Sequence, residues 1–146
     1  MRSRKLLLSI SVGQFGCGVT GLAVAIARRH AYDLPVLHGD PDDVVRNAWP
    51  WGTALSAPGP MLVLQALAIG ALVARPDPRA ARTLGALGVL MVPGYLAERL
   101  VRHRLTRDGW DRLESPLAFA GLGLAVGMAG LGLDRAAGWR PGSRVS

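Results

Sequence analysis

Four stretches of apolar residues, separated by charged segments, dominate the chain. The first extends without a charged residue over 6–27 and the second over 53–74, 22 residues each. Because an α-helix rises about 1.5 Å per residue, each stretch is about 33 Å long as a helix, enough to cross the roughly 30 Å hydrocarbon core of a bilayer. We therefore predict transmembrane helices over 6–27 and 53–74.

The other two apolar stretches are shorter. Residues 83–97 and 116–133 contain 15 and 18 residues without a charge. Fifteen helical residues reach only about 22 Å, so we expect the third helix to draw in its neighbours and to cover 81–101. Pro93 removes one backbone hydrogen bond and predicts a kink in this helix. The fourth helix is predicted over 116–133.

The start of the second helix is ambiguous, because Pro58 and Pro60 fall within its first turns. Proline bends a helix when it lies inside it, but it is well tolerated at the first helical position. In the second case the helix starts near Gly59, keeps about 15 residues and ends short of one membrane interface.

Polar segments connect and follow the apolar stretches. Residues 28–52 form a loop with three prolines, which argue against one continuous helix. Trp49 and Trp51 at the end of this loop are typical of the aromatic belt at a membrane interface. Residues 134–146 are predicted to be a mobile tail. The whole chain, 1–146, is thus predicted to be a single integral membrane domain, an all-α, four-helix transmembrane bundle.

The first stretch has a second interpretation, as a cleaved signal peptide. Basic residues precede it, and Ala25 and Ala27 resemble a small-x-small cleavage site. Its 22 apolar residues exceed the roughly 7–15 of a signal-peptide core. We therefore favour a retained helix.

The charge distribution fits a membrane protein better than a nucleic-acid binder. Half of the residues are hydrophobic, and the formal net charge is +7, with 17 Lys and Arg against 10 Asp and Glu. The basic residues occupy every gap between apolar stretches and do not gather on one face with aromatic residues between them. Since charges are costly in hydrocarbon, we expect a lipid bilayer and no nucleic acid as partner.

Four spans would place both termini on the same side of the cell membrane. That side would carry nine basic residues and the other side eight, a near tie under the positive-inside rule. We prefer cytoplasmic termini because the first helix usually dominates orientation. The tie leaves open a dual-topology chain that assembles as an antiparallel dimeric channel.

Small residues recur at every fourth position in three of the helices, a pattern that permits close helix packing in lipid. We favour an interface inside the bundle over one with a second copy or a membrane-protein partner. The positions are Ser9, Gly13, Cys17, Gly21 and Ala25; Ala66, Gly70 and Ala74; and Gly123 and Gly127.

Two amides interrupt the apolar stretches. Measured from the side of the termini, Gln14 lies about 12 Å and Gln65 about 13–14 Å along its helix. Antiparallel helices would bring them to the same depth, so we predict that they hydrogen-bond to each other. The pair is interpreted as a structural link between helices, or alternatively as a ligand contact.

The best candidate for a site follows the third apolar stretch. Tyr95, Glu98, Arg99 and Arg102 share one helical face at spacings of three and four, and ionisable groups drawn toward a bilayer are often functional. The alternative is structural: Arg99 reaches toward the interface and Glu98 pairs with Arg102.

Several chemistries are not expected. The single Cys17 cannot form an internal disulfide, and the acidic run over 38–43 lacks the spacing of a calcium loop, so we expect no metal site. The three histidines lie outside the apolar stretches, which argues against haem ligation, and we expect no cofactor. No charged residue lies at mid-membrane and no catalytic motif is recognisable, so we favour a non-enzymatic role.

Three hypotheses for function follow. The first is a small membrane protein that binds a lipidic ligand or serves as a partner subunit. The second is a membrane enzyme or carrier that acts on an apolar substrate near Glu98, using Tyr95, Arg102 or His103. A pocket beside Glu98 would favour the second, whereas a filled bundle with an exposed glycine face would favour the first. The third is the antiparallel dimeric channel.

Overall fold

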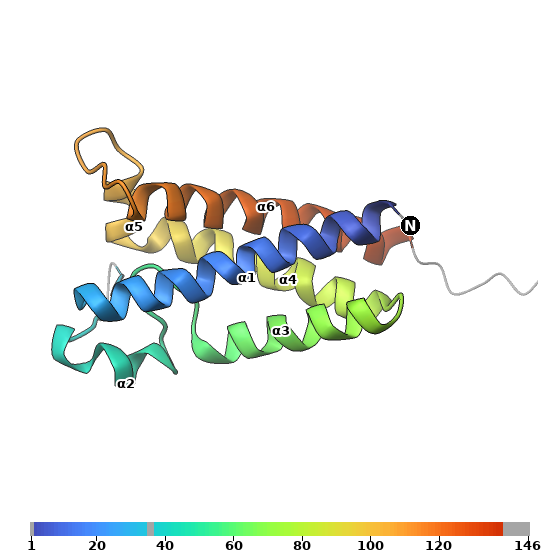
Figure 1. Ribbon diagram of the computed structural model, residues 1–146, viewed down its shortest axis with the longest axis horizontal. Coiled ribbons are helices and arrows are strands. Elements are labelled where there is room, and N and C mark those ends of the chain that lie inside the picture. The colour runs from blue at the N-terminus through green and yellow to red at the C-terminus, as the bar shows by residue number, and fades with distance from the viewer. Residues whose placement is uncertain (1, 35–36, 139–146) are drawn as a thin grey trace, which may run out of the picture.

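The chain folds into a bundle of four long helices that lie side by side along the long axis of the molecule (Figure 1). We describe residues 2–34 and 37–138 of the computed structural model. The long helices are α1 (Arg2–Arg28), α3 (Gly59–Ala74), α4 (Pro78–Ala97) and α6 (Glu114–Gly138). The predicted all-α fold class is thereby confirmed.

Three of these helices, α1, α4 and α6, are long and apolar enough to cross a membrane, judged by length and composition. The fourth, α3, is apolar but has only 16 residues.

Short elements gather at one end of the bundle, opposite to the N-terminus (Figure 1). We call this the capped end; it comprises residues 29–58 and 98–113. Strands β1 and β2 pair antiparallel, with Asp33 opposite His38. The bounds of the short elements are β1 (Asp33–Leu34), β2 (Leu37–His38), η1 (Pro41–Asp43), α2 (Val44–Ala48) and α5 (Arg99–Arg104).

Helix α3 begins at Gly59, so the prediction of a helix from residue 53 was wrong and the alternative start holds. Pro58 is its N-cap in an extended conformation (φ −51°, ψ 145°), and the next proline falls in the first turn. A proline there costs no hydrogen bond, because the first amides of a helix have no partner within it. Residues 53–56 instead form a tight turn closed by an antiparallel bridge between Thr53 and Ser56.

Helix α4 differs from its predicted range of 81–101 at both ends. It begins at Pro78, where the Asp77 carboxylate accepts the backbone N–H groups of the first turn at 2.8 and 3.2 Å. Pro93 lies inside the helix without ending it. The helix ends at Ala97 because Glu98 is extended (φ −69°, ψ 122°), and α5 starts afresh after it.

Helix α6 is longer than the predicted 116–133. It begins at Glu114 and continues to Gly138, so residues 134–138, predicted as part of a mobile tail, are helical. The rest of that tail, 139–146, lies outside the described residues.

The closest helix crossing joins α4 to α6 through two glycines. A Cβ built on Gly132 would lie 2.5 Å from the Cα of Gly85, and one on Gly88 would lie 2.6 Å from the carbonyl oxygen of Ala125. No residue with a side chain fits at Gly132 without moving the helices apart. Close backbone approach of this kind is how helices associate in lipid.

The small-residue pattern predicted in α3 does not face the bundle. Ala66, Gly70 and Ala74 are exposed, whereas larger residues of the opposite face, Leu62 and Leu72 among them, are buried. In α1 the predicted pattern holds only in part: Gly21 and Ala25 are buried, Gly13 and Cys17 are partly buried, and Ser9 is exposed. The core selects these faces because the larger side chains fill the space between four helices, while small residues suffice only where backbones touch. The buried residues of α1 are Leu7, Ser11, Gln14, Gly18, Gly21 and Ala25.

Candidate functional site

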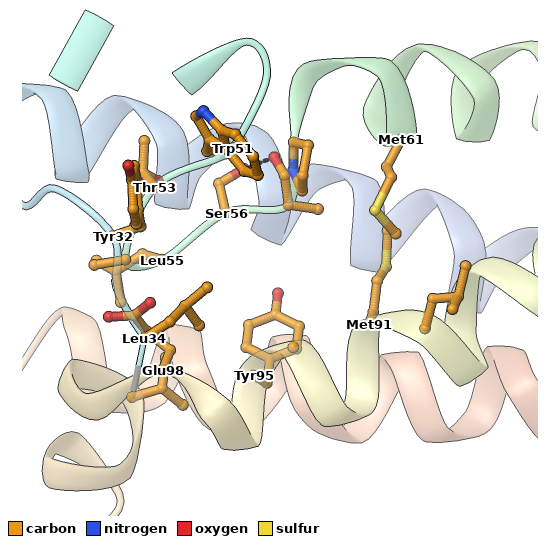
Figure 2. A pocket seen from close by; sticks show the side chains of 16 residues that line it. Tyr32, Leu34, Trp51, Thr53, Leu55, Ser56, Met61, Met91, Tyr95 and Glu98 are labelled. Carbon is orange, nitrogen blue, oxygen red and sulfur yellow. Dashed lines mark hydrogen bonds between the residues drawn. The ribbon is translucent and has the colours of Figure 1, made fainter. Parts of the chain in front are cut away.

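A cavity of about 220 Å³ lies at the capped end, between α4 and the loop that precedes α3 (Figure 2). Its floor is the last turns of α4, and its roof is the segment over 51–58. Most of the wall is apolar. The lining residues are Tyr32, Leu34, Trp51, Thr53, Ala54, Leu55, Ser56, Ala57, Pro58, Met61, Leu90, Met91, Gly94, Tyr95, Glu98 and Val101.

Two glycines hold the roof of the cavity in place. Gly52 has φ +82°, a left-handed conformation that favours glycine, and it starts the turn to Ser56. Gly21 of α1 lies directly against the backbone carbonyl of Leu55, so a side chain at position 21 would collide with that carbonyl. The turn over 53–56 therefore packs directly on α1, and α3 begins only after it, at Gly59.

The Thr53 hydroxyl is a buried polar group without a partner. Thr53 is 6% exposed and lines the cavity, and its Oγ1 has no hydrogen-bond partner among the described residues. A buried hydroxyl without a hydrogen bond is costly, so such groups usually face a ligand or water.

Glu98 is buried at the junction of α4 and α5, with 5% exposure. Its two carboxylate oxygens accept the backbone N–H of Asp33 at 2.9 and 3.1 Å, which ties β1 to the end of α4. Burial raises the pKa of the Glu98 carboxyl above its ordinary value, because the ionised form loses its hydration, while the Asp33 N–H acts in the opposite direction.

The alternative pairing of Glu98 with Arg102 was wrong. Within the described residues, no basic group lies within 4 Å of the Glu98 carboxylate. Arg102 and His103 are exposed and do not line the cavity. Arg99 contacts the Asp33 carboxylate at 3.8 Å, at an open groove on the outer side of Tyr32. Of the residues predicted on this face, only Tyr95 and Glu98 line the cavity.

The predicted hydrogen bond between Gln14 and Gln65 is confirmed. Gln65 Nε2 donates to Gln14 Oε1 at 2.7 Å and to the backbone oxygen of Ser11 at 3.0 Å. Both amides are at most 1% exposed, and Gln65 Oε1 has no partner among the described residues. Gln14 also forms a side-chain hydrogen bond with Tyr95, whose hydroxyl lies against Gly121 of α6. A chain of polar groups therefore leads from the wall of the cavity into the bundle.

Glu114 is the centre of a charged cluster that sequence reasoning missed. Its side chain is fully buried and contacts Arg28 Nη1 at 2.6 Å, Arg104 Nε at 2.7 Å and His30 Nε2 at 3.1 Å. The cluster joins α1, the following loop, α5 and α6 beside the cavity. Arg28 directly follows the first apolar stretch and Glu114 closely precedes the fourth, so the depth comparison that paired the two glutamines would also have suggested this pair.

The acidic run after the hairpin is engaged in local contacts. Asp40 accepts the N–H of Asp42 at 2.9 Å, and Asp42 and Asp43 pair with Arg29 and Arg46, each at 3.1 Å. Exposed carboxylates with such partners stabilise the loop and do not converge on one point.

The cavity therefore combines a mainly apolar wall with a buried carboxylate, two phenols and two hydroxyls, of which the Thr53 hydroxyl has no partner among the described residues. This arrangement suits the binding of a small ligand that is mainly apolar. No protein-family model, curated protein or solved structure matches this chain.

Proposed function

We propose that this chain is a four-span integral membrane protein that binds a small, mainly apolar ligand in the cavity at its capped end. The spans are α1, α3, α4 and α6, and the walls of the cavity come from α4 and the loops around Tyr32 and Thr53.

The outer surface of the bundle supports a membrane location. Large apolar side chains point outward along all four long helices, among them Val12, Leu67, Leu90 and Val126 at 53–66% exposure. A continuous apolar surface of this kind suits acyl chains and is rare on proteins surrounded by water.

Three tryptophans support an interface at the capped end. Trp49, Trp51 and Trp110 all lie there and are 56–61% exposed. Tryptophan collects at the level of lipid headgroups. The cavity would then lie near the boundary between acyl chains and headgroups.

The short α3 is compatible with a full crossing. Its 16 residues are about 24 Å long, less than the hydrocarbon core. The buried residues from Gly52 to Ser56 continue from its start toward the capped end. Irregular backbone is tolerated at membrane depth where protein buries it or where it lines a cavity.

The observation that carries the binding proposal is the Thr53 hydroxyl, which is buried in the wall of a mainly apolar cavity and has no hydrogen-bond partner among the described residues. A ligand with one polar atom would satisfy it. The volume is below the roughly 300–1,000 Å³ of pockets for drug-sized molecules, so the ligand should be small.

The cavity lies beside Glu98, so this part of the bundle is not filled. That favours the second hypothesis, in which an apolar substrate binds near Glu98. Arg102 and His103 lie outside the cavity, which leaves only Tyr95 and Glu98 of the reactive groups considered. That incomplete set supports binding or carriage of the ligand rather than a reaction on it.

Quenching of tryptophan fluorescence tests the proposal. The probe is a brominated medium-chain alcohol, titrated into the purified protein in detergent micelles. We expect saturable quenching that disappears in Trp51→Phe, because Trp51 lines the cavity. Trp110→Phe is the matched control, since Trp110 is equally exposed at the same end but packs on Phe119 outside the cavity.

Thr53→Val, which replaces the hydroxyl by a methyl group, should weaken saturable quenching by roughly threefold to tenfold. Quenching that rises linearly with the alcohol, and equally in both tryptophan variants, would mean simple partition into the micelle and would contradict the proposal.

A further inference from the structure

The Glu98 carboxyl group lines the cavity, and among the described residues it forms no ion pair. Its hydrogen bonds come from the backbone N–H groups of Asp33 and Leu100, and within the described residues no Arg, Lys or His lies within 4 Å of it. Arg102 influences it only at longer range from an exposed position. A buried carboxylate in such surroundings carries a large desolvation cost, which a cation in the cavity would offset.

Aromatic rings surround the same space. Tyr32, Trp51 and Tyr95 all line the cavity (Figure 2), and the rings of Tyr32 and Trp51 are 6.4 Å apart at an interplanar angle of 41°. The faces of such rings attract a cation through their negative quadrupole.

The remaining wall excludes the strongly hydrated cations. Met61 and Met91 close one side of the cavity, and Leu34 and Leu55 lie near Glu98 (Figure 2). A metal ion would need several oxygen ligands, and within the described residues no group of three His, Cys, Asp or Glu side chains comes together. An organic cation with apolar substituents satisfies both the rings and the wall.

We propose that the ligand of this cavity is a small organic cation, such as a quaternary ammonium group with an apolar substituent, held between the Glu98 carboxylate and the rings of Tyr32, Trp51 and Tyr95. The inference rests on the proposed function, because it names the chemical class of the ligand at the same site. Burial that raises the pKa of Glu98 is consistent with a carboxylate that gains from a positive partner.

An isosteric pair of probes separates charge from shape. Benzyltrimethylammonium and its uncharged carbon analogue neopentylbenzene have the same outline, and each competes with the brominated alcohol for saturable quenching of Trp51. We expect the cation to displace the alcohol at a concentration roughly tenfold or more below that of the neutral analogue, after correction for micelle partition.

Glu98→Gln provides the second measurement. We expect it to weaken binding of the cation by roughly tenfold or more and to leave the neutral analogue unchanged. Asp42→Asn is the matched control, because it removes the same charge from the capped end at an exposed position outside the cavity. It should change neither affinity.

The possible failures are distinguishable. If the neutral analogue binds as well as the cation, or if neither displaces the alcohol, the ligand is not a cation and the inference is wrong, while the binding cavity stands. If the alcohol itself shows no saturable quenching, the proposed function fails as well. The comparison of the two probes needs only the unmodified protein, so it remains decisive if Glu98→Gln does not fold.

Discussion

The side-chain amide of Gln65 donates a 2.7 Å hydrogen bond to the side-chain oxygen of Gln14, across the interface between α3 and α1. Both residues are buried to 1% exposure or less. An amide in such surroundings has no water to replace a lost partner, so the loss of either glutamine leaves the other without the hydrogen bond that joins them.

Replacing the two glutamines should therefore give non-additive losses of stability. We expect Gln14→Leu and Gln65→Leu each to destabilise the bundle, and the double variant to lose less than the sum by about 0.6–2 kcal/mol. Unfolding in mixed micelles measures all three free energies. Additive losses would mean that the hydrogen bond contributes nothing to folding.

Removing the Glu114 carboxylate should be among the most harmful single changes. Glu114→Gln leaves Arg104 and His30 without their anionic partner and Arg28 with Asp111 alone, and we expect a loss of roughly 2–4 kcal/mol. Asp43→Asn, which breaks the exposed ion pair with Arg46, should cost less than about 1 kcal/mol. Equal losses of unfolding free energy for the two variants would show that Glu114 does not hold the charged cluster together.

The crossing of α4 and α6 should tolerate an added methyl group less well than another position of α6. Gly132→Ala places a Cβ 2.5 Å from the Cα of Gly85, so we expect a loss of roughly 1–3 kcal/mol. Gly130→Ala meets nothing within 4 Å and should be neutral or slightly stabilising. Thermal unfolding of both variants checks this. A tolerated Gly132→Ala would mean that the helices are farther apart than described.

Acid should destabilise the protein partly through Asp111. Backbone N–H groups of Glu114 and Leu113, followed by Arg28, lower the pKa of Asp111 from 3.8 to about 2. A lowered pKa gives stability that is present above the ordinary value and is lost as the pH falls toward 2. Asp111→Asn should therefore lower stability at neutral pH and flatten the loss between about pH 4 and 2. An unchanged acid profile would contradict this role.

Glu98 should have the opposite effect on the pH dependence of stability to that of Asp111. Its pKa is raised by burial, so its contribution is fully present below the ordinary value of 4.5 and is lost as the pH rises through the raised pKa. We expect Glu98→Gln to remove that loss and to make stability less dependent on pH above 4.5. Unfolding measured over a pH series provides the test, with a steeper profile in the variant as the contrary outcome.

The proposed four-span topology predicts which positions lie on opposite sides of the membrane. In a Cys17→Ser background, single cysteines at the exposed positions Arg46 and Arg75, which flank α3, should react with an impermeant maleimide from opposite sides of oriented vesicles. With three spans and α3 in the interface, the two positions would instead label from the same side. Labelling of each position from both sides would support the dual-topology channel.

The depth of residues along their helices was predictable from the sequence, and it was enough to pair Gln14 with Gln65. The course of the loops was not. Glu98 turns to the N–H of Asp33 because a short hairpin brings β1 to the end of α4, and nothing within residues 95–102 reveals that neighbour. Local spacing therefore suggested Arg102 as its partner.

The start of α3 was likewise only partly predictable from the sequence. The prolines allowed two starts, and only the packing of the 53–56 turn on Gly21 of α1 decides between them. The cavity could not be predicted for this reason, since most of its roof belongs to residues expected to be the first turns of a helix. Tyr32 and Thr53 carried no local signal that would have marked them as wall residues.

The contact of Gly85 with Gly132 also determines which parts of the molecule can move. Two helices whose backbones touch cannot slide or rotate past each other without breaking that contact, so α4 and α6 behave as a rigid spine. Helix α3 and the turn before it do not take part in that contact, so they can move without breaking it. A ligand of the proposed cavity would then enter past this turn, on the side away from α4.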